Sequence, residues 1–211
     1  MSSITISTLL ILSAYLLGSI PTGYLLARSL KGIDIREHGS GSTGATNVLR
    51  SVGKYPAVAV LLIDLLKGSL AVASVNLAYN YLAADLLPAS WHPWLIIGTA
   101  LSAIIGHSKS VWLNFTGGKS VATTLGVLFV MNPAVALGTL ATFGVILSIS
   151  RIVSLSSICG AIAVNILMLV LGQPIAFSLF AALAGVYVIV RHKTNIERLL
   201  AGNEPKIGQA L

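Results

Sequence analysis

The sequence predicts an all-α, polytopic membrane protein with about seven transmembrane helices, and three observations lead to this fold class. Hydrophobic residues make up 55% of the 211 positions and charged residues only 9%, whereas soluble domains carry about 25% charged residues. The apolar residues are collected in long runs, and about 20 consecutive apolar residues cross a bilayer as a helix. Basic residues other than Lys67 lie in the polar segments that follow every second run. We therefore treat residues 1–211 as one integral membrane domain.

The expected helices follow from these runs in chain order. The first run contains Gly18 and Pro21, which are tolerated inside helical bundles. Asn132-Pro133 and Gly172-Gln173-Pro174 mark turns between later runs. The region 94–131 is the least well defined, because neither of its two runs reaches the length of a full span. The expected apolar segments are 4–27, 55–79, 94–106, 121–131, 134–149, 153–171 and 175–190.

The distribution of positive charge predicts the orientation in the membrane. Every lysine and arginine except Lys67 falls in the polar segments that follow the first, third, fifth and seventh runs. Cytoplasmic loops carry such an excess, so we expect the N-terminus outside and the C-terminus in the cytoplasm. The net charge of +7 is then explained by the membrane, and no nucleic-acid partner is expected. The polar segments 28–54, 107–119 and 191–198 would share the cytoplasmic face.

The first of these segments contains a glycine-rich stretch, Gly39-Ser40-Gly41-Ser42-Thr43-Gly44-Ala45-Thr46-Asn47, followed by Arg50. Glycine allows consecutive backbone N–H groups to face an anion, and arginine offers a planar fork that suits phosphate. Ala45 stands where a P-loop requires lysine, which argues against a nucleotide triphosphatase. A flexible glycine linker is the alternative. The candidate phosphate-binding residues are Gly39, Ser40, Gly41, Gly44, Thr46, Asn47 and Arg50.

The second segment contains Gly117-Gly118-Lys119-Ser120 at the start of an apolar run. Free backbone N–H groups, the positive end of a helix dipole and a cation together favour an anion. Leu113 stands where a P-loop has its first glycine, so this is not a complete P-loop. Two glycine-rich anion sites on one membrane face suggest that two phosphates bind side by side.

The third segment, 191–198, contains His192 and Asn195. Residues three apart lie on one face of a helix, so both side chains could orient a polar substrate. An ordinary basic tail that binds anionic lipid is the alternative. His, Cys and carboxylate residues show no metal-ligand spacing, and we expect neither a metal nor another cofactor.

Asp64 and Lys67 are the ionisable residues inside an apolar run. Their spacing of three places them on one helix face. Ionisable residues within a span are costly and often functional. A structural pair near the membrane interface is slightly favoured over direct chemistry.

These motifs resemble the bacterial acyl-phosphate:glycerol-3-phosphate acyltransferase family (PlsY). The resemblance runs from about Tyr15 to Leu199 and includes all three segments in order, together with Gly106-His107 and the stretch 64–68. It implies a seven-helix enzyme of the bacterial inner membrane with a cytoplasmic active site. Such an enzyme transfers a fatty acyl group from acyl-phosphate to glycerol 3-phosphate, giving lysophosphatidate and phosphate. Carried over residue by residue, the resemblance assigns catalytic and substrate-holding roles to Ser40, Thr46, Asn47, Arg50, Lys119, His192 and Asn195.

The chain departs from the family at four places. Ser42-Thr43 replaces a usual Asn-Pro, Thr116 replaces a lysine and Ser120 replaces a glycine. Lys109 stands where the family has an apolar residue. Because the glycines and Lys119 are retained, these changes put substrate affinity in question and leave the reaction class intact.

The expected reaction needs no covalent enzyme intermediate, because acyl-phosphate is a mixed anhydride with a good leaving group. We expect direct attack by the hydroxyl, with substrate phosphate as the proton acceptor and His192 as an orienting group. Acyl-phosphate, glycerol 3-phosphate and the bilayer are the expected partners, and the enzyme that makes acyl-phosphate is a further candidate. The alternative is a transporter or channel for phosphate-bearing solutes, which would use glycine-broken helices near the membrane midplane.

Overall fold

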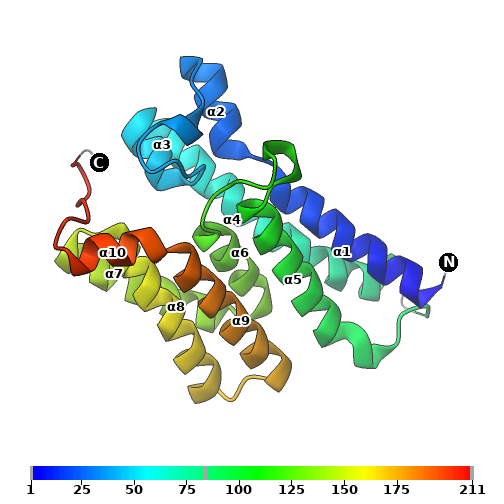
Figure 1. Cartoon of the computed structure of the whole chain (residues 1–211). Coiled ribbons are helices and arrows are strands. Elements are labelled where there is room, and N and C mark those ends of the chain that lie inside the picture. The colour runs from blue at the N-terminus through cyan, green and yellow to red at the C-terminus, as the bar shows by residue number, and fades with distance from the viewer. Residues whose placement is uncertain (1, 83–84, 210–211) are drawn as a thin grey trace.

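The computed structural model describes residues 2–82 and 85–209, and these form helices joined by short connections (Figure 1). Within the described ranges no strand occurs, apart from one isolated bridge between Ser110 and Thr116. The all-α prediction is confirmed. The helices are α1 Ser3–Ser19, α2 Thr22–Lys31, α3 Ala45–Ser51, α4 Lys54–Leu77, α5 His92–Ser108, α6 Val121–Met131, α7 Pro133–Ser150, α8 Val153–Val170, α9 Ile175–Arg191 and α10 Lys193–Leu200. Shorter elements are the 3₁₀ turns η1 Ile35–Glu37, η3 Ala89–Trp91 and η4 Val111–Leu113, and the π turn η2 Ala78–Leu82.

Several helices are long and apolar enough to cross a bilayer. Among the described residues four stretches qualify: Ser3–Lys31, Lys54–Tyr81, Pro133–Ser150 and Val153–Val170. A fifth is formed by α9 and α10 if these two helices, bent by 61°, count as one span. Helices α5 and α6 have 17 and 11 residues. The number of seven spans therefore stays a prediction.

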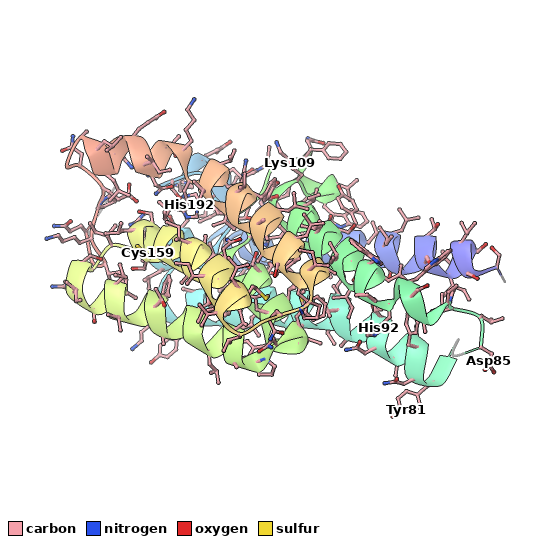
Figure 2. The ribbon with its side chains drawn as sticks, turned by 90° about the horizontal axis from the view of Figure 1, so that it is seen from below. Tyr81, Asp85, His92, Lys109, Cys159 and His192 are labelled. Carbon is pink, nitrogen blue, oxygen red and sulfur yellow. The ribbon has the colours of Figure 1, made fainter. Side chains whose placement is uncertain are left out.

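The two ends of the molecule differ in what they carry. The start of α1 lies at one end with the 85–91 connection, whereas α3, α10 and the tail after α10 gather at the other (Figure 1). Tyr81, Asp85 and His92 likewise lie at the end opposite α10 (Figure 2). The inside-outside orientation stays a prediction.

The first expected span is broken in the middle. Helix α1 ends at Ser19 and α2 begins at Thr22. Pro21 has no N–H and its ring excludes a helical residue before it, and Ile20 accordingly has ψ 114°. The Ile20 carbonyl is not left unpaired, because the ammonium of Lys67 on α4 donates a hydrogen bond to it at 3.0 Å.

Helices α4 and α6 pack at very short range through glycines. A Cβ on Gly68 would lie 2.1 Å from the carbonyl oxygen of Thr123, and one on Gly126 would lie 1.9 Å from that of Leu65. Small residues are the usual means of bringing helix backbones together in a membrane. The start of α6, which follows Lys119, is thereby fixed against α4.

The apolar core lies among α4, α5, α6, α8, α9 and the start of α7. Its largest fully buried side chains include Ile104, Leu128, Met168 and Phe180. A smaller cluster lies under the first glycine-rich segment and contains Ala27, Ile35, Val48 and Val60. This second cluster explains α3, a helix of seven residues that the sequence analysis did not predict, because Val48 anchors it.

Candidate functional site

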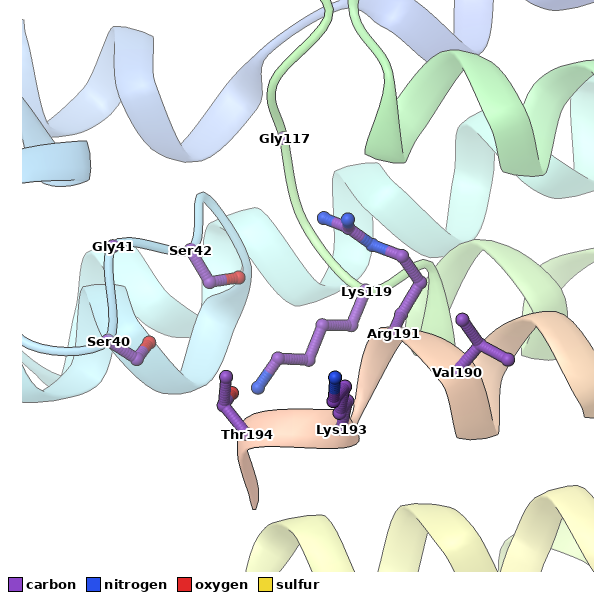
Figure 3. A pocket seen from close by; sticks show the side chains of 9 residues that line it. All are labelled: Ser40, Gly41, Ser42, Gly117, Lys119, Val190, Arg191, Lys193 and Thr194. Carbon is purple, nitrogen blue, oxygen red and sulfur yellow. The ribbon is translucent and has the colours of Figure 1, made fainter. Parts of the chain in front are cut away.

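The three polar segments meet at one cavity of about 290 Å³ (Figure 3). Lys119 extends between the serines of the first segment and the start of α10 (Figure 3). The structure therefore brings the two glycine-rich segments together, and the binding of two phosphates side by side stays a prediction. The lining residues are Ser40, Gly41 and Ser42 from the first segment, Gly117 and Lys119 from the second, and Val190, Arg191, Lys193 and Thr194 from the third.

A second cavity of about 330 Å³ adjoins the first. It is lined by Arg36, Gly41, Lys109, Phe115, Thr116, Gly117 and Arg191. Gly41, Gly117 and Arg191 belong to the walls of both cavities. Among the described residues lining the two cavities there are basic side chains on each side and no carboxylate. The arrangement offers two adjoining places for an anion.

Asn47 shapes the first glycine-rich segment. Its side chain is 1% exposed. The amide nitrogen donates to the carbonyls of Ile35 at 3.2 Å, His38 at 2.9 Å and Ser42 at 2.9 Å, and the amide oxygen accepts from the Ser40 N–H at 3.0 Å. Its hydrogen-bonding capacity is thus occupied by backbone, so Asn47 holds the loop that carries Ser40 and Gly41.

The ammonium of Lys119 donates to the amide oxygen of Asn195 at 2.5 Å. Burial is the largest influence on the pKa of Lys119 and lowers it to about 8. Nearby Glu204 opposes this shift in pKa, while the positive charges of Arg198, Arg191 and Arg50 add to it. Lys119 is therefore a cation near neutral pH whose charge is lost in the mildly alkaline range.

Asn195 is held in turn by Glu204, a carboxylate from the tail after α10. The Asn195 amide nitrogen donates to Glu204 Oε1 at 2.6 Å. Ser154 on α8 donates to the same oxygen at 2.7 Å, and Arg198 donates to Oε2 at 2.7 Å. Burial tends to raise the pKa of Glu204, but these three hydrogen bonds outweigh it and leave the pKa lowered. Glu204 thus stays ionised and fixes which end of the Asn195 amide faces Lys119.

His192 lies at the bend between α9 and α10 and is 3% exposed. Its Nδ1 is 2.7 Å from the carbonyl oxygen of Val188. A carbonyl only accepts, so Nδ1 carries a proton and Nε2 is the free acceptor in the neutral ring. In the described part of the chain no ion pair joins His192 to a carboxylate. This geometry suits an orienting group.

Not every predicted residue lines a cavity. The Arg50 guanidinium reaches the tail, with Nη2 3.5 Å from the carbonyl oxygen of Pro205. Of the predicted set, Ser40, Gly41, Gly117 and Lys119 line the first cavity. The other predicted residues do not line it: Gly39, Gly44, Thr46, Asn47, Arg50, Gly118, His192 and Asn195.

Sequence reasoning missed several residues that the structure brings to the site. Arg191, Lys193 and Thr194 line the first cavity, and a basic cluster directly after an apolar run was their only signal. Arg36 and Lys109 line the second cavity, and Arg36 is paired with Asp34 at 2.6 Å. Glu204 gave no signal except that it is an acidic residue in a basic tail.

Comparison with known proteins identifies the family. Residues 8–202 match the family described as glycerol-3-phosphate acyltransferase. The glycerol-3-phosphate acyltransferase of Rippkaea orientalis (strain PCC 8801 / RF-1) is 68% identical over 206 residues, covering 98% of this chain and 95% of that protein. The corresponding protein of Crocosphaera subtropica (strain ATCC 51142 / BH68) is 59% identical, covering 98% and 96%.

Solved structures agree with this assignment. The crystal structure of PlsY (YgiH), an integral membrane glycerol 3-phosphate acyltransferase, in its glycerol 3-phosphate form matches with a TM-score of 0.85 and 38% identity, covering 96% of both chains. Its lysophosphatidic acid form matches with a TM-score of 0.82 and 38% identity, covering 96% of this chain and 95% of that one. The predicted membrane class and the predicted family are both confirmed: this chain belongs to the glycerol-3-phosphate acyltransferase family.

Proposed function

We propose that this chain transfers a fatty acyl group from acyl-phosphate to glycerol 3-phosphate, giving 1-acyl-glycerol 3-phosphate and inorganic phosphate. The observation that carries the proposal is the pair of adjoining cavities lined by basic side chains and glycine backbone. Both substrates carry a phosphate group, and the reaction must hold them next to each other.

The two cavities provide for the two phosphates with different groups. Lys119, Arg191 and Lys193 offer positive charge in the first cavity, with hydroxyl donors from Ser40 and Ser42. In the second cavity, Arg36, Lys109 and Arg191 offer charge beside the Thr116 hydroxyl. Arginine binds phosphate through two parallel N–H donors, whereas lysine acts as a point charge.

The chemistry requires orientation more than a protein nucleophile. The glycerol 3-phosphate hydroxyl oxygen forms a bond to the acyl carbonyl carbon. The bond between that carbon and the phosphate oxygen breaks, and phosphate leaves with the electron pair. Holding the reactants in a near-attack geometry supplies a large part of such a rate enhancement. Arg191, shared by both cavities, would also stabilise charge that develops on the leaving phosphate.

The hydroxyl proton is transferred to a phosphate oxygen. Phosphate monoesters have a second pKa of about 6 and so accept a proton at neutral pH. His192 Nε2 then serves to orient the substrate, because Nδ1 is committed to Val188. Asn195 holds Lys119, while Asn47 holds the loop of Ser40. Gly39, Gly44, Thr46 and Gly118 complete the segments that place these groups, and Arg50 fastens the tail.

The site would face the cytoplasm of a bacterial inner membrane, where glycerol 3-phosphate is dissolved. The acyl chain would enter from the bilayer between the helices. This placement rests on the alternating positive charge of the polar segments. The enzyme that produces acyl-phosphate is a candidate neighbour, because that substrate is reactive and amphipathic.

A phosphate-release assay tests the proposal. The purified chain, in detergent or vesicles, receives acyl-phosphate with and without glycerol 3-phosphate, and released phosphate and acylated product are both measured. We expect both products to appear in equal amounts and only with both substrates present. Turnover with acyl-CoA but none with acyl-phosphate would overturn the assignment of the donor. Uptake of glycerol 3-phosphate into vesicles without acylation would support the transporter alternative.

A further inference from the structure

We propose that His107, supported by the buried Asp64–Lys67 ion pair, is a positioning residue that holds Gly117–Gly118 and thereby places Lys119 and Arg191 at the cavities. Neither Asp64, Lys67 nor His107 lines either cavity. Their contribution is therefore made through the backbone of the second glycine-rich segment. The effect on turnover rests on the proposed function, whereas the contacts themselves do not.

The support begins with an ion pair inside the helix bundle. Asp64 is 2% exposed and Lys67 is 3% exposed, and Lys67 Nζ lies 2.9 Å from Asp64 Oδ1. A buried pair is costly unless further hydrogen bonds satisfy it. Lys67 has such a bond, to the Ile20 carbonyl at the break between α1 and α2. The pair thus has a fixed partner outside α4, at the break between α1 and α2, and can serve as a rigid base.

His107 connects this base to the second glycine-rich segment. Its Nδ1 is 3.6 Å from Asp64 Oδ1, and the residue is buried at the end of α5. The opposite edge of the ring faces Gly118: a Cβ built on Gly118 would lie only 2.1 Å from His107 Nε2. The imidazole therefore occupies the space between Asp64 and the Gly118 backbone.

The backbone N–H and carbonyl groups of Gly118 are both hydrogen-bonded as well. Its N–H donates to the His107 carbonyl at 3.2 Å, and its carbonyl accepts from Arg191 Nη2 at 3.1 Å. Gly117 packs on the same backbone, because a Cβ there would lie 2.3 Å from the His107 carbonyl oxygen. The segment is thus enclosed between His107 and Arg191, with Lys119 as the next residue.

Removing the imidazole should therefore move both cations together. A misplacement of about 1 Å at a reacting group can lower a rate about 100-fold. We expect His107→Ala to raise KM for both substrates. If His107 has no positioning role, this substitution should leave both KM values unchanged. His107→Gln, which keeps a polar side chain of similar reach, should recover part of the loss.

A steric compensation experiment distinguishes positioning from general destabilisation. Gly118→Ala places a methyl group on the His107 ring, so we expect a loss of kcat/KM on the order of 100-fold. In the His107→Ala background the ring is gone and the methyl group fits. His107→Ala/Gly118→Ala should then be no worse than His107→Ala alone, although independent effects would multiply.

Gly117→Ala is the matched control. Its added methyl group would meet the His107 carbonyl oxygen and, at 3.1 Å, the Ser108 Cα, both of which remain when His107 becomes alanine. Gly117→Ala should therefore stay impaired in the His107→Ala background. Equal recovery of both glycine variants, or multiplicative loss in the Gly118 pair, would overturn the proposal.

Melting temperatures of the same variants separate this inference from the proposed function. If the wild-type chain lacks acyltransferase activity, the proposed function fails, but recovery of thermal stability in His107→Ala/Gly118→Ala still tests the contact. If wild-type activity is present and no compensation occurs in either measurement, the positioning role fails while the proposed function stands.

Discussion

Lys119 is the residue on which most of the site's interactions converge. Its ammonium lines the first cavity and bonds to Asn195, which is bonded to Glu204. The carboxylate thus acts on the cation through an amide and does not itself line the cavity. This arrangement leaves the positive charge of Lys119 available to a phosphate while its side chain is held still.

The pKa of Lys119 leads to a pH prediction. Because burial lowers it to about 8, the charged fraction in the free enzyme falls as pH rises through that value. A phosphate dianion binds the charged form, so kcat/KM for glycerol 3-phosphate should decline above about pH 8. Lys119→Arg should remove the decline even if its activity is lower, because arginine stays charged. A wild-type profile that remains flat to pH 10 would contradict this role.

Loss of the Lys119 side chain should be severe. A hydrogen bond to a charged group contributes about 1.5–3 kcal/mol, so Lys119→Ala should lower kcat/KM by at least about 10- to 150-fold. Arg50→Ala should also impair turnover, through the tail that Arg50 contacts at Pro205. Steady-state kinetics with both substrates varied would measure this. Near-normal kinetics in both variants would show that the site is elsewhere.

The family usually has a lysine where this chain has Thr116, and the position of Lys109 leads to a prediction about that difference. Both residues line the second cavity, and the bridge between Ser110 and Thr116 holds their backbones close together. A lysine at either position would therefore present its charge to the same cavity. We expect Lys109→Leu to raise the KM of one phosphate substrate about tenfold, and Lys109→Leu/Thr116→Lys to reverse the loss. If the double variant is as poor as the single one, the two positions are not equivalent.

At the scale of elements, α4 has two tasks. It crosses the core as an apolar helix, and it carries Asp64 and Lys67, which form an ion pair. Lys67 also bonds to the Ile20 carbonyl at the break between α1 and α2. The structure confirms that Asp64 and Lys67 lie on one helix face and form a pair, and it buries this pair inside the bundle. Its purely structural role and its position near the membrane interface stay predictions.

The burial of this pair predicts how substitutions combine. Asp64→Leu or Lys67→Met alone leaves one charge buried without its partner, which costs about 3–5 kcal/mol. The double variant leaves neither charge, so its melting temperature in detergent should exceed that of both single variants. Ser69, which bonds to the Gly126 carbonyl at 2.9 Å, provides a control on the same helix: Ser69→Ala should change the melting temperature equally in every background. A double variant no more stable than Lys67→Met would show that the loss is set by the missing Lys67 bond to Ile20 and not by an unpaired charge.

At the scale of the molecule, the sequence predicted the helices from α6 to α9 closely. Their expected segments, 121–131, 134–149, 153–171 and 175–190, agree with the observed ends within a residue or two. These apolar runs are separated by Asn-Pro, Arg151 and Gly-Gln-Pro, so the ends of the helices could be placed within narrow limits. The prediction was poorer at 28–54, where α3 is a short helix stabilised by a local cluster around Val48, because tertiary packing decides such helices.

The site was predicted less completely than the fold, for a physical reason. Backbone motifs such as Gly117–Gly118 are visible in a sequence because glycine is needed where chains pack closely. Arg191, Lys109 and Glu204 are ordinary exposed-type residues in sequence. Only the folding of α9, α10 and the tail against the two loops brings Arg191 to the cavities and Glu204 to Asn195. Lys109 reaches the second cavity from the second loop itself. Motif reasoning therefore found the loops and missed the cations between them.

The predicted orientation in the membrane is testable with single cysteines. Glu37 and Ser90 are exposed and lie on η1 and η3. The turn η1 packs against α3, and α3 lies at the end of the molecule opposite the 85–91 connection that contains η3 (Figure 1). In a Cys159→Ser background, a membrane-impermeant thiol reagent applied to intact cells should modify Ser90→Cys and spare Glu37→Cys. Both should react after the cells are opened. The reverse pattern would place the two cavities outside the cell and away from a cytosolic substrate.

Arg191 stands in the wall of both cavities, and this couples the two ligands thermodynamically. Any shift of its guanidinium toward one phosphate changes the electrostatic attraction between Arg191 and the other phosphate. Linkage then requires that glycerol 3-phosphate change the affinity for the acyl donor by the same factor as the donor changes the affinity for glycerol 3-phosphate. Two dianions that share one guanidinium compete for its charge, so the factor should be unfavourable while both substrates are bound. The acyl group moves from one phosphate-bearing molecule to the other, and the phosphate left behind is free to leave. After it has left, the guanidinium of Arg191 interacts only with the phosphate of the lipid product.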